Sequence, residues 1–510
     1  MKKILRFLLS RIFWFSLLIV VQIGIFALIL LNISSYSNAL YIAFVLVSLA
    51  IVIWLVTKDD NPSYKITWII LIMTLPVLGG FFYLKFGNKT LPRRYQERMS
   101  EHHRQNASLY EEEAGDTAAM ESLYPRFGVQ TDYIRRVSGF PVYSDTQVEY
   151  LPLGEDFFQR LCEELPRAER FIFLEYFIIE KGLMWDTVLE ILKERAAAGV
   201  EVCLIYDDFG CIQRLAAGYP KELAAYNIKA FPYNAMRPSM DSSLNYRDHR
   251  KICVIDGQVG ITGGINLADE YINRVERFGH WKDTAVLLRG SAVRSLTRMF
   301  LQQWTLNAGD NTLNLPQEEY LTAQPVPAQG FVQPFPDTPL DHFNVAENAY
   351  LHLVQRSNRY VYITTPYLIL DNEFVTSLKT AAESGVDIRI ITPSHPDKWY
   401  VHMVSRSYYQ TLMQSGVKIY EYTPGFIHAK MALCDDDTAM VGTANLDYRS
   451  LYLHYENAVL LYHTPVISDI KRDIEETMEK SHLITEQELR SKLRGNPVLC
   501  ALLRLLAPLM

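Results

Sequence analysis

The sequence lacks the features of a disulfide-stapled, zinc-dependent or nucleic-acid-binding protein. Its six cysteines are scattered, and no two have the Cys-x-x-Cys spacing of a zinc or redox site. Acidic residues outnumber basic ones, so the formal net charge is −7 at pH 7. Nucleic-acid binders usually carry a basic surface, so this balance disfavours a nuclease. No histidine stands at metal-ligand spacing from carboxylates or cysteines, and we expect neither a metal nor a cofactor.

Long apolar runs are concentrated in the first 87 residues. Candidate membrane segments cover residues 12–31, 40–56 and 66–84, and the first is long enough to span a bilayer. Pro76, Gly79 and Gly80 interrupt the third segment. A cleaved signal peptide is the alternative for the first run, but that run is long and lacks a small-residue cleavage site. We therefore expect residues 1–87 to form a multi-pass region in the cell membrane.

The basic residues around these segments give conflicting indications of orientation. Those between positions 2 and 11 predict a cytoplasmic N-terminus, and those between positions 85 and 98 should also be cytoplasmic. Three full spans would place the two basic clusters on opposite sides of the membrane. Either one segment is therefore re-entrant or interfacial, or one basic cluster lies on the non-cytoplasmic side. We favour an incompletely inserted third segment and a cytoplasmic catalytic region.

One motif occurs twice with identical internal spacing. The copies are His249, Lys251, Asp256, Gly263 and Asn266, and then His428, Lys430, Asp435, Gly442 and Asn445. The alternative is two buried hairpins whose polar residues coincide by chance, and we disfavour it because every offset repeats. A histidine, a cation and an amide at fixed spacing, present twice, indicate one phosphate-handling site built from two half-sites.

The spacing predicts that each copy folds as a β-hairpin. Apolar runs at 252–255 and 431–434 end in turn-forming residues and predict buried strands. Because strand side chains alternate, the histidine and lysine of each copy share a face. The glycines then allow close backbone approach to a ligand. Asp256 and Asp435 follow their histidines by seven residues, on the opposite face, so we interpret them as structural although they belong to the catalytic motif.

A similar α/β unit precedes each copy. Predicted strands at 171–179 and 199–206 flank a helix at 185–197, and strands at 360–365 and 385–391 flank a helix at 373–383. Strands alternating with helices predict an α/β sheet in each half. We expect two pseudo-symmetric domains, 136–311 and 340–485, that meet face to face and bring the two motifs together.

Three further segments complete the predicted organisation. A basic linker covers residues 88–135, and a linker with six prolines covers residues 312–339. The tail, residues 486–510, ends in an apolar stretch. It suits an amphipathic helix on the membrane surface and, equally, packing on the catalytic domain.

The duplicated His-x-Lys-x4-Asp motif resembles that of the phospholipase D superfamily. The wider sequence resembles the bacterial cardiolipin synthases, notably at residues 61–87, 279–284, 365–367 and 442–450. The resemblance extends from about Asn61 to the C-terminus. It implies two phospholipase D-like domains and transfer of a phosphatidyl group between two phosphatidylglycerol molecules. It also implies that His249 is the nucleophile and His428 the acid and base, roles that the spacing does not separate.

Phosphodiester chemistry explains why these residue types are needed. Negative charge shields the phosphorus, and a histidine nucleophile divides the transfer into two easier steps. The second histidine protonates the leaving alcohol and then deprotonates the incoming one. The residues expected to hold the phosphate oxygens are Lys251, Lys430, Asn266 and Asn445.

Residues outside the motif complete the expected site. Each imidazole needs an acceptor on its other nitrogen, and we expect Asp283 to orient His249 and Glu456 to orient His428. Solvated surface carboxylates are the alternative for both. His280 and His454 are expected at the rim or behind the residues that contact the substrate. Arg449 suits either a lipid headgroup contact or a structural salt bridge.

Other functions compete with phosphatidyl transfer. Water as acceptor would make the protein a hydrolytic phospholipase D, and other phosphatidyl acceptors stay open. A nuclease is disfavoured by the apolar N-terminus, and a non-catalytic membrane scaffold by the intact His, Lys and Asn in both copies. We therefore expect a membrane phosphatidyltransferase whose partners are phosphatidylglycerol and the membrane, not nucleic acid. The sequence identifies no protein partner.

Overall fold

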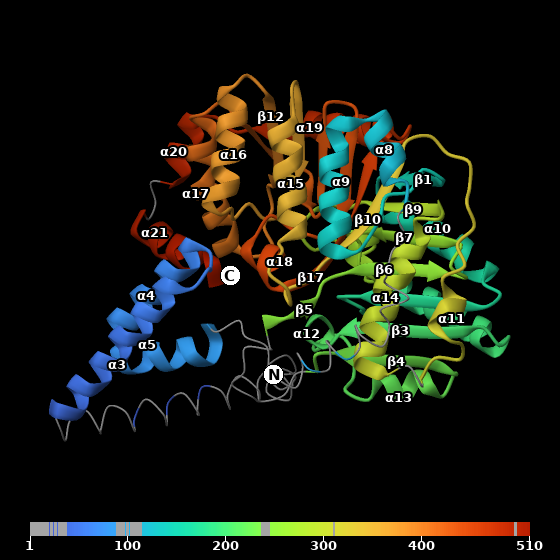
Figure 1. Ribbon diagram of the computed structural model, residues 1–510, viewed down its shortest axis with the longest axis horizontal. Helices are drawn as coiled ribbons and strands as arrows, with labels where there is room; N and C mark the ends of the chain where they lie inside the picture. Colours follow the sequence, from blue (N-terminus) through green and yellow to red (C-terminus); the bar gives the residue numbers. More distant parts are fainter. Residues whose placement is uncertain are drawn as a thin grey trace.

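The computed structural model describes residues 20, 24, 28, 38–87, 97, 101, 115–235, 245–309, 312–493 and 497–509. Two α/β halves lie side by side, and α3 (Asn38–Thr57), α4 (Pro62–Thr74) and α5 (Pro76–Phe82) project away from them (Figure 1). A π-helical turn, η1 (Tyr83–Gly87), ends this N-terminal region.

The first half is built on a seven-stranded mixed sheet. Its strands, in spatial order, are β1 (Thr146–Leu151), β9 (Ala285–Gly290), β7 (Val259–Gly263), β6 (Lys251–Ile255), β2 (Phe171–Tyr176), β3 (Glu201–Asp207) and β4 (Ile228–Tyr233). Strands β2, β3 and β4 are parallel, and every other neighbouring pair is antiparallel.

Alternation along β2 shows why this sheet is covered on both faces. Phe171 and Phe173 pack in the cluster that contains α14 (Val293–Ala308). Ile172 and Leu174 pack in the cluster of α10 (Gly154–Glu164) and α11 (Leu183–Ala197). A central strand buried on both sides is apolar almost throughout, as the sequence of β2 is. The short helices α12 (Asp208–Cys211) and α13 (Tyr219–Ala224) complete this half.

The second half repeats the strand order and directions of the first and adds an antiparallel edge strand, β18. Its strands, in spatial order, are β10 (Phe331–Asp337), β17 (His454–Tyr462), β16 (Thr438–Gly442), β15 (Met431–Cys434), β11 (Tyr360–Thr364), β12 (Asp387–Pro393), β13 (Lys418–Tyr422) and β18 (Ser481–Leu483). Its main helices are α15 (Val345–Arg356), α16 (Asn372–Glu383), α17 (Trp399–Met413), α18 (Tyr448–Tyr452) and α19 (Ile467–Glu479). The two-sheet α/β architecture expected from the sequence is therefore present.

Two short parallel ladders join the halves beside the motifs. Strand β5 (Arg247–Asp248) pairs with β17, so the chain just before His249 lies on the second half. Strand β14 (Gly425–Ile427) pairs with β8 (His280–Lys282), so the chain just before His428 lies on the first half. The backbone N–H groups of His249 and His428 donate to Tyr455 and Lys282 carbonyls at 2.9 and 2.7 Å.

Both predicted linkers contain regular structure. Residues 331–337, assigned to the proline-rich linker, form the edge strand β10. Val332 exchanges backbone hydrogen bonds with Tyr143 on the side opposite β17. Backbone N–H groups alternate in direction along a strand, so every second residue counted from Val332 also faces away from β17. Pro334 and Pro336 are two such residues and cost the sheet no ladder bond. Within the predicted basic linker, residues 117–123 and 125–138 form α8 (Thr117–Leu123) and α9 (Pro125–Ser138), and α9 packs on α15 and β10.

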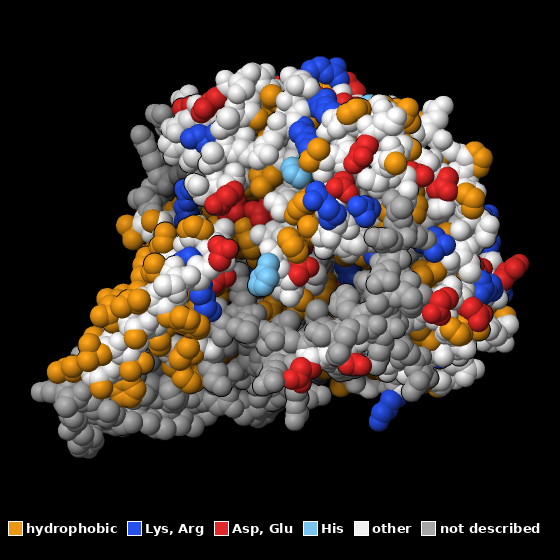
Figure 2. Space-filling model, in the orientation of Figure 1, with side chains coloured by type: hydrophobic (Ala, Val, Ile, Leu, Met, Phe, Trp, Pro, Cys, Tyr) orange, Lys and Arg blue, Asp and Glu red, His pale blue; other side chains and the backbone are white. Residues whose placement is uncertain are grey.

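The three predicted membrane segments differ in how much of each the structure describes and in whether it forms one helix. Segment 12–31 falls outside the described residues except for positions 20, 24 and 28, and segment 40–56 lies within α3. Segment 66–84 is divided at Leu75, and Pro76 begins α5. Among the described residues, no helix combines the length and apolarity needed to cross a bilayer. Hydrophobic side chains nevertheless cover the outside of α3, α4 and α5 (Figure 2), including Leu46 and Ile53, each 60% exposed.

The tail packs on the catalytic body. Helices α20 (Glu486–Leu493) and α21 (Pro497–Leu506) follow β18, and both contact α17. Thr67 Oγ1 of α4 donates to the Leu505 carbonyl at 2.7 Å, and the Arg504 guanidinium lies over the Tyr408 ring. The tail thus joins the N-terminal helices to the second half, which is the packing alternative expected from the sequence.

Candidate active site

The motif aspartates brace the hairpins rather than entering the site. Asp256 and Asp435 occupy the hairpin turns with φ of 54° and 53°, a left-handed conformation that aspartate tolerates. Each carboxylate accepts three backbone N–H groups, from residues 169–171 at 2.8 Å and from residues 358–360 at 2.6–2.9 Å. Each aspartate therefore fastens its turn to the start of the neighbouring strand, and these bonds support a structural role for both.

The two motif histidines meet in one cavity of about 660 Å³ between the halves. His249 and His428 are 6% and 7% exposed, and Asn266 and Asn445 line the same cavity. The predicted convergence of the two half-sites is confirmed. The wall also carries aromatic and charged side chains that the motif did not indicate.

The orienting carboxylates are exchanged between the halves, so the predicted pairing was wrong. His249 Nδ1 lies 2.9 Å from both oxygens of Glu456, and His428 Nδ1 lies 2.6 Å from Asp283 Oδ2. The cause is the pair of ladders, which places each histidine against the strand that carries the other half's carboxylate. Both carboxylates are fully buried, which excludes the alternative of solvated surface groups.

The protonation of this centre suits a neutral nucleophile. Burial lowers the pKa of His249 to about 3, against the opposing effect of Glu456. Burial and the charge of Lys430 place the pKa of His428 well below its ordinary value. Burial raises the pKa of Asp283 to about 6, against the opposing charge of Lys430. A bound phosphate would add negative charge and favour the imidazolium form that a general acid needs.

The two lysines lie beneath the histidines. Lys251 and Lys430 each donate to the carbonyl of the histidine two residues before them, and Lys430 Nζ is 2.7 Å from His428 Nδ1. Burial lowers their pKa values to about 7 and about 8, and the charge of Lys430 also acts to lower the pKa of Lys251. Neither lysine is among the residues that line the cavity surface. They supply positive charge from below it.

The two asparagines differ in their contacts. Asn266 is engaged at both ends, because its oxygen accepts from Ile178 N–H at 2.9 Å and its amide donates to Tyr271 Oη at 2.7 Å. Asn445 Oδ1 is buried and has no hydrogen-bond partner among the described residues. The pseudo-symmetry of the motif is thus broken at the amides.

His454 lies in the site itself rather than only at its rim. Its ring centroid is 5.6 Å from that of His249, and its Nδ1 is 3.7 Å from Glu456 Oε1. Within the described part of the chain, His249, His454 and Glu456 are the one group whose ligand atoms approach within 4.8 Å in a way that suits a metal. Glu456 already bonds His249 and Thr443. The one usable signal in the sequence was the alternation along β17, which places His454 on the same face as Glu456.

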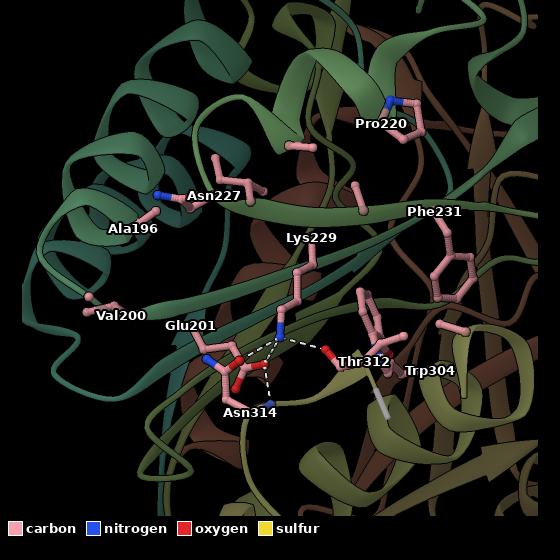
Figure 3. Close-up of a pocket in the computed structure, with 15 residues that line it drawn as sticks. Ala196, Val200, Glu201, Pro220, Asn227, Lys229, Phe231, Trp304, Thr312 and Asn314 are labelled. Carbon is pink, nitrogen blue, oxygen red and sulfur yellow. Dashed lines mark hydrogen bonds and ion pairs between the residues drawn. The ribbon is translucent and has the colours of Figure 1, made fainter. Parts of the chain in front are cut away.

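A second cavity, of about 690 Å³, lies beside β3 and β4 (Figure 3), and neither motif histidine lines it. Lys229 Nζ there contacts Glu201 at 2.6 Å, the Thr312 carbonyl at 2.6 Å and Asn314 Oδ1 at 2.9 Å. Tyr320 also donates to Glu201. These bonds tie the chain between the halves to the first sheet, so we assign this cavity no chemistry.

Duplicated α/β halves with two carboxylate-oriented histidines in one cavity define the class of phospholipase D-like proteins. The family model described as "Cardiolipin synthase, PLD-like domain" matches residues 161–304 and 350–478, and the model "Phospholipase_D-nuclease N-terminal" matches residues 44–88. The chain belongs to the cardiolipin synthase family of phospholipase D-like proteins.

Several proteins are similar over most of the chain. An uncharacterised protein of Streptococcus mutans is 41% identical, over 90% of this chain and 99% of its own length. A cardiolipin synthase of Geobacillus kaustophilus is 35% identical over 89% of this chain and 90% of its own. The crystal structure of phosphatidylserine synthase from Haemophilus influenzae has a TM-score of 0.57 at 14% identity, over 74% of this chain and 99% of that one. That structure supports the fold alone.

Proposed function

We propose that the protein is a cardiolipin synthase. It transfers a phosphatidyl group from one phosphatidylglycerol to a hydroxyl of a second and releases glycerol. The observation that carries the proposal is the pair of cavity-lining imidazoles, each with its Nδ1 held by a buried carboxylate. This arrangement leaves both Nε2 atoms for chemistry. The relatives named cardiolipin synthase support the choice of substrate.

The first half-reaction forms a phosphohistidine. His249 Nε2 attacks the phosphorus of the donor lipid, and the bond from phosphorus to the glycerol oxygen breaks. His428 gives its proton to that oxygen, and glycerol leaves. Glu456 accepts the Nδ1 proton of His249 in a hydrogen bond and stabilises the positive charge that develops on the ring. The buried lysines stabilise the oxygens of the phosphoryl group from beneath.

The second half-reaction reverses the roles of proton donor and acceptor. The hydroxyl of a second phosphatidylglycerol loses its proton to His428, and its oxygen attacks the phosphohistidine. The bond between Nε2 and phosphorus breaks, and His249 is regenerated with cardiolipin as product. Asp283 holds His428 in the same orientation throughout both steps.

We also propose that residues 1–87 hold the enzyme at the cell membrane as a multi-pass region, with a cytoplasmic catalytic part. The apolar outer surface of α3, α4 and α5 supports membrane contact. Catalytic domains at 136–311 and 340–485 would then act on lipids delivered within the bilayer. Cell fractionation tests the location, and protease digestion of inverted vesicles tests the side.

The activity test uses purified protein in liposomes of labelled phosphatidylglycerol, followed by separation of the lipids. We expect cardiolipin and glycerol in equal amounts, with no loss of activity in the presence of a chelator. Phosphatidic acid as the sole lipid product would show hydrolysis instead and contradict the proposal. His249→Ala and His428→Ala proteins serve as inactive controls.

A further inference from the structure

The catalytic cavity contains one cation that differs from the others. Its basic residues other than histidine are Arg214, Arg247, Arg277, Lys398 and Arg449. Four of them form ion pairs at 3.0–3.7 Å with cavity or wall carboxylates: Arg214 and Arg277 with Glu270, Lys398 with Asp397, and Arg247 with Asp207. Within the described part of the chain, no hydrogen bond or ion pair is assigned to the Arg449 side chain. A half-buried guanidinium without an ion pair can bind a ligand anion.

Two neighbouring groups also retain hydrogen-bonding capacity. Neither ring nitrogen of His454 forms a hydrogen bond among the described residues, although Nδ1 faces Glu456 Oε1 at 3.7 Å, and Asn445 Oδ1 has no hydrogen-bond partner there either. All three residues come from one segment, 445–454, which includes α18 and opens onto the cavity. Burial lowers the pKa of Arg449, against the opposing charge of Asp447 in the same cavity. The charge of Arg449 in turn lowers the pKa of His454, after the larger effect of burial.

The duplication shows that this segment departs from the symmetry of the fold. Counting from the motif asparagines, Arg449 corresponds to Glu270, whose carboxylate is neutralised by two arginines. Counting from the orienting carboxylates, His454 corresponds to Trp281. In the first half, Glu270 is ion-paired and Trp281 is largely apolar. In the second half, Arg449 is a cation with no ion pair among the described residues, and His454 is polar.

The surroundings of the two histidines follow the same asymmetry. His428 is flanked by the rings of Trp281, Tyr271 and Phe426 at centroid distances of 5.5–5.9 Å. His249 has His454 at 5.6 Å and Phe177 at 5.0 Å. The cavity thus has an aromatic end and a polar end. A reaction between two phospholipids needs places for two phosphates, and only one of them reacts.

We propose that Arg449 and His454 bind the phosphate of the acceptor phospholipid, which does not react, while the donor phosphate lies between the two motif histidines. This assignment rests on the proposed phosphatidyl transfer. The acceptor hydroxyl and the acceptor phosphate are separated by the three carbons of glycerol. A phosphate held beside His454 therefore remains within reach of the phosphohistidine on His249. The subsite favours phosphatidylglycerol over water and over neutral alcohols as acceptor.

The test compares an acceptor that carries a phosphate with one that does not. With labelled glycerol, the enzyme exchanges the headgroup of phosphatidylglycerol: the bond from phosphorus to the unlabelled glycerol breaks and a bond to labelled glycerol forms. This exchange needs the donor site alone. Cardiolipin synthesis, and transfer to labelled glycerol phosphate, need the acceptor phosphate as well. The variants are Arg449→Gln, Arg449→Lys and His454→Gln.

We expect Arg449→Gln to lower cardiolipin synthesis and transfer to glycerol phosphate about 10-fold or more, with glycerol exchange within about twofold of wild type. Arg449→Lys should recover part of the loss. The matched variant Arg277→Gln removes a cavity cation already paired with Glu270 and should keep the wild-type ratio of cardiolipin to exchanged glycerol. Equal loss of all three reactions in Arg449→Gln, or no loss, would overturn the assignment. Wild-type protein that exchanges glycerol without forming cardiolipin would instead contradict the proposed function.

Discussion

The exchanged pairing of the histidines makes Glu456→Gln the most informative single substitution. Glutamine keeps the size of the side chain and removes the charge that both carboxylate oxygens present to His249 Nδ1 at 2.9 Å. Thr443 can still donate to the amide oxygen, so the fold around β17 is retained. The substitution therefore tests the orientation and charge stabilisation of the nucleophile without opening a cavity.

The expected magnitude follows from two effects. A hydrogen bond to a charged group contributes about 1.5–3 kcal/mol, which corresponds to about a 10- to 150-fold loss in the rate of phosphohistidine formation. Burial lowers the pKa of Lys251 to about 7 even though the charge of Glu456 raises it. Without Glu456, Lys251 would lose its proton at lower pH. The loss should be largest above pH 7, and the alkaline limb of the rate profile should move toward acid.

The assay is rapid mixing with labelled phosphatidylglycerol followed by quenching in base, because phosphohistidine survives base and hydrolyses in acid. The matched control is Glu421→Gln, which removes a buried carboxylate bonded to Arg406 outside the cavity. We expect the control to form the intermediate within about twofold of the wild-type rate. A Glu456→Gln protein that forms it at the wild-type rate and pH profile would refute the role given to Glu456.

Three further predictions follow from the geometry. His428→Ala should lower turnover about 1000-fold or more while leaving lipid binding to liposomes unchanged, as measured by flotation, because it removes the proton donor. Activity should fall as the pH drops through about 6, because Asp283, whose pKa is raised, then becomes protonated and no longer accepts from His428 as a carboxylate. Asp283→Asn should abolish this acid limb of the pH profile. An unchanged acid limb in that variant would exclude Asp283 as its origin. Asp435→Ala should lower the free energy of unfolding by about 2–4 kcal/mol, because three backbone N–H groups lose their acceptor, and thermal melting in detergent would contradict this if the midpoint did not move.

The duplicated motif was enough to predict the local structure of each half of the fold. The spacing from His249 to Asn266 predicted a hairpin with its aspartate at the turn, because strand alternation and turn chemistry are local properties. It also predicted that Asp283 and Glu456 are the orienting carboxylates. It assigned each to the wrong histidine, because the ladders of β5 with β17 and of β14 with β8 join segments about 150–200 residues apart.

Other features were hidden for equally physical reasons. Pro334 and Pro336 predicted a linker, but an edge strand accommodates proline where the N–H would face outward. Arg449 left two interpretations open, because a sequence does not show whether a cation has a partner in the folded state. Among the described residues Arg449 forms no ion pair, which stands out only against the four paired cations of the same cavity.

The central claim is that one histidine from each half acts on one phosphate, with His249 carrying the intermediate. The most direct measurement is to react the wild-type protein with phosphatidylglycerol, quench it in base during turnover, digest it and locate the modified residue by mass spectrometry. The account predicts a phosphatidyl group, or the phosphate derived from it, on His249 alone, and none in His249→Ala. Modification of any other residue, or turnover by His249→Ala, would contradict it.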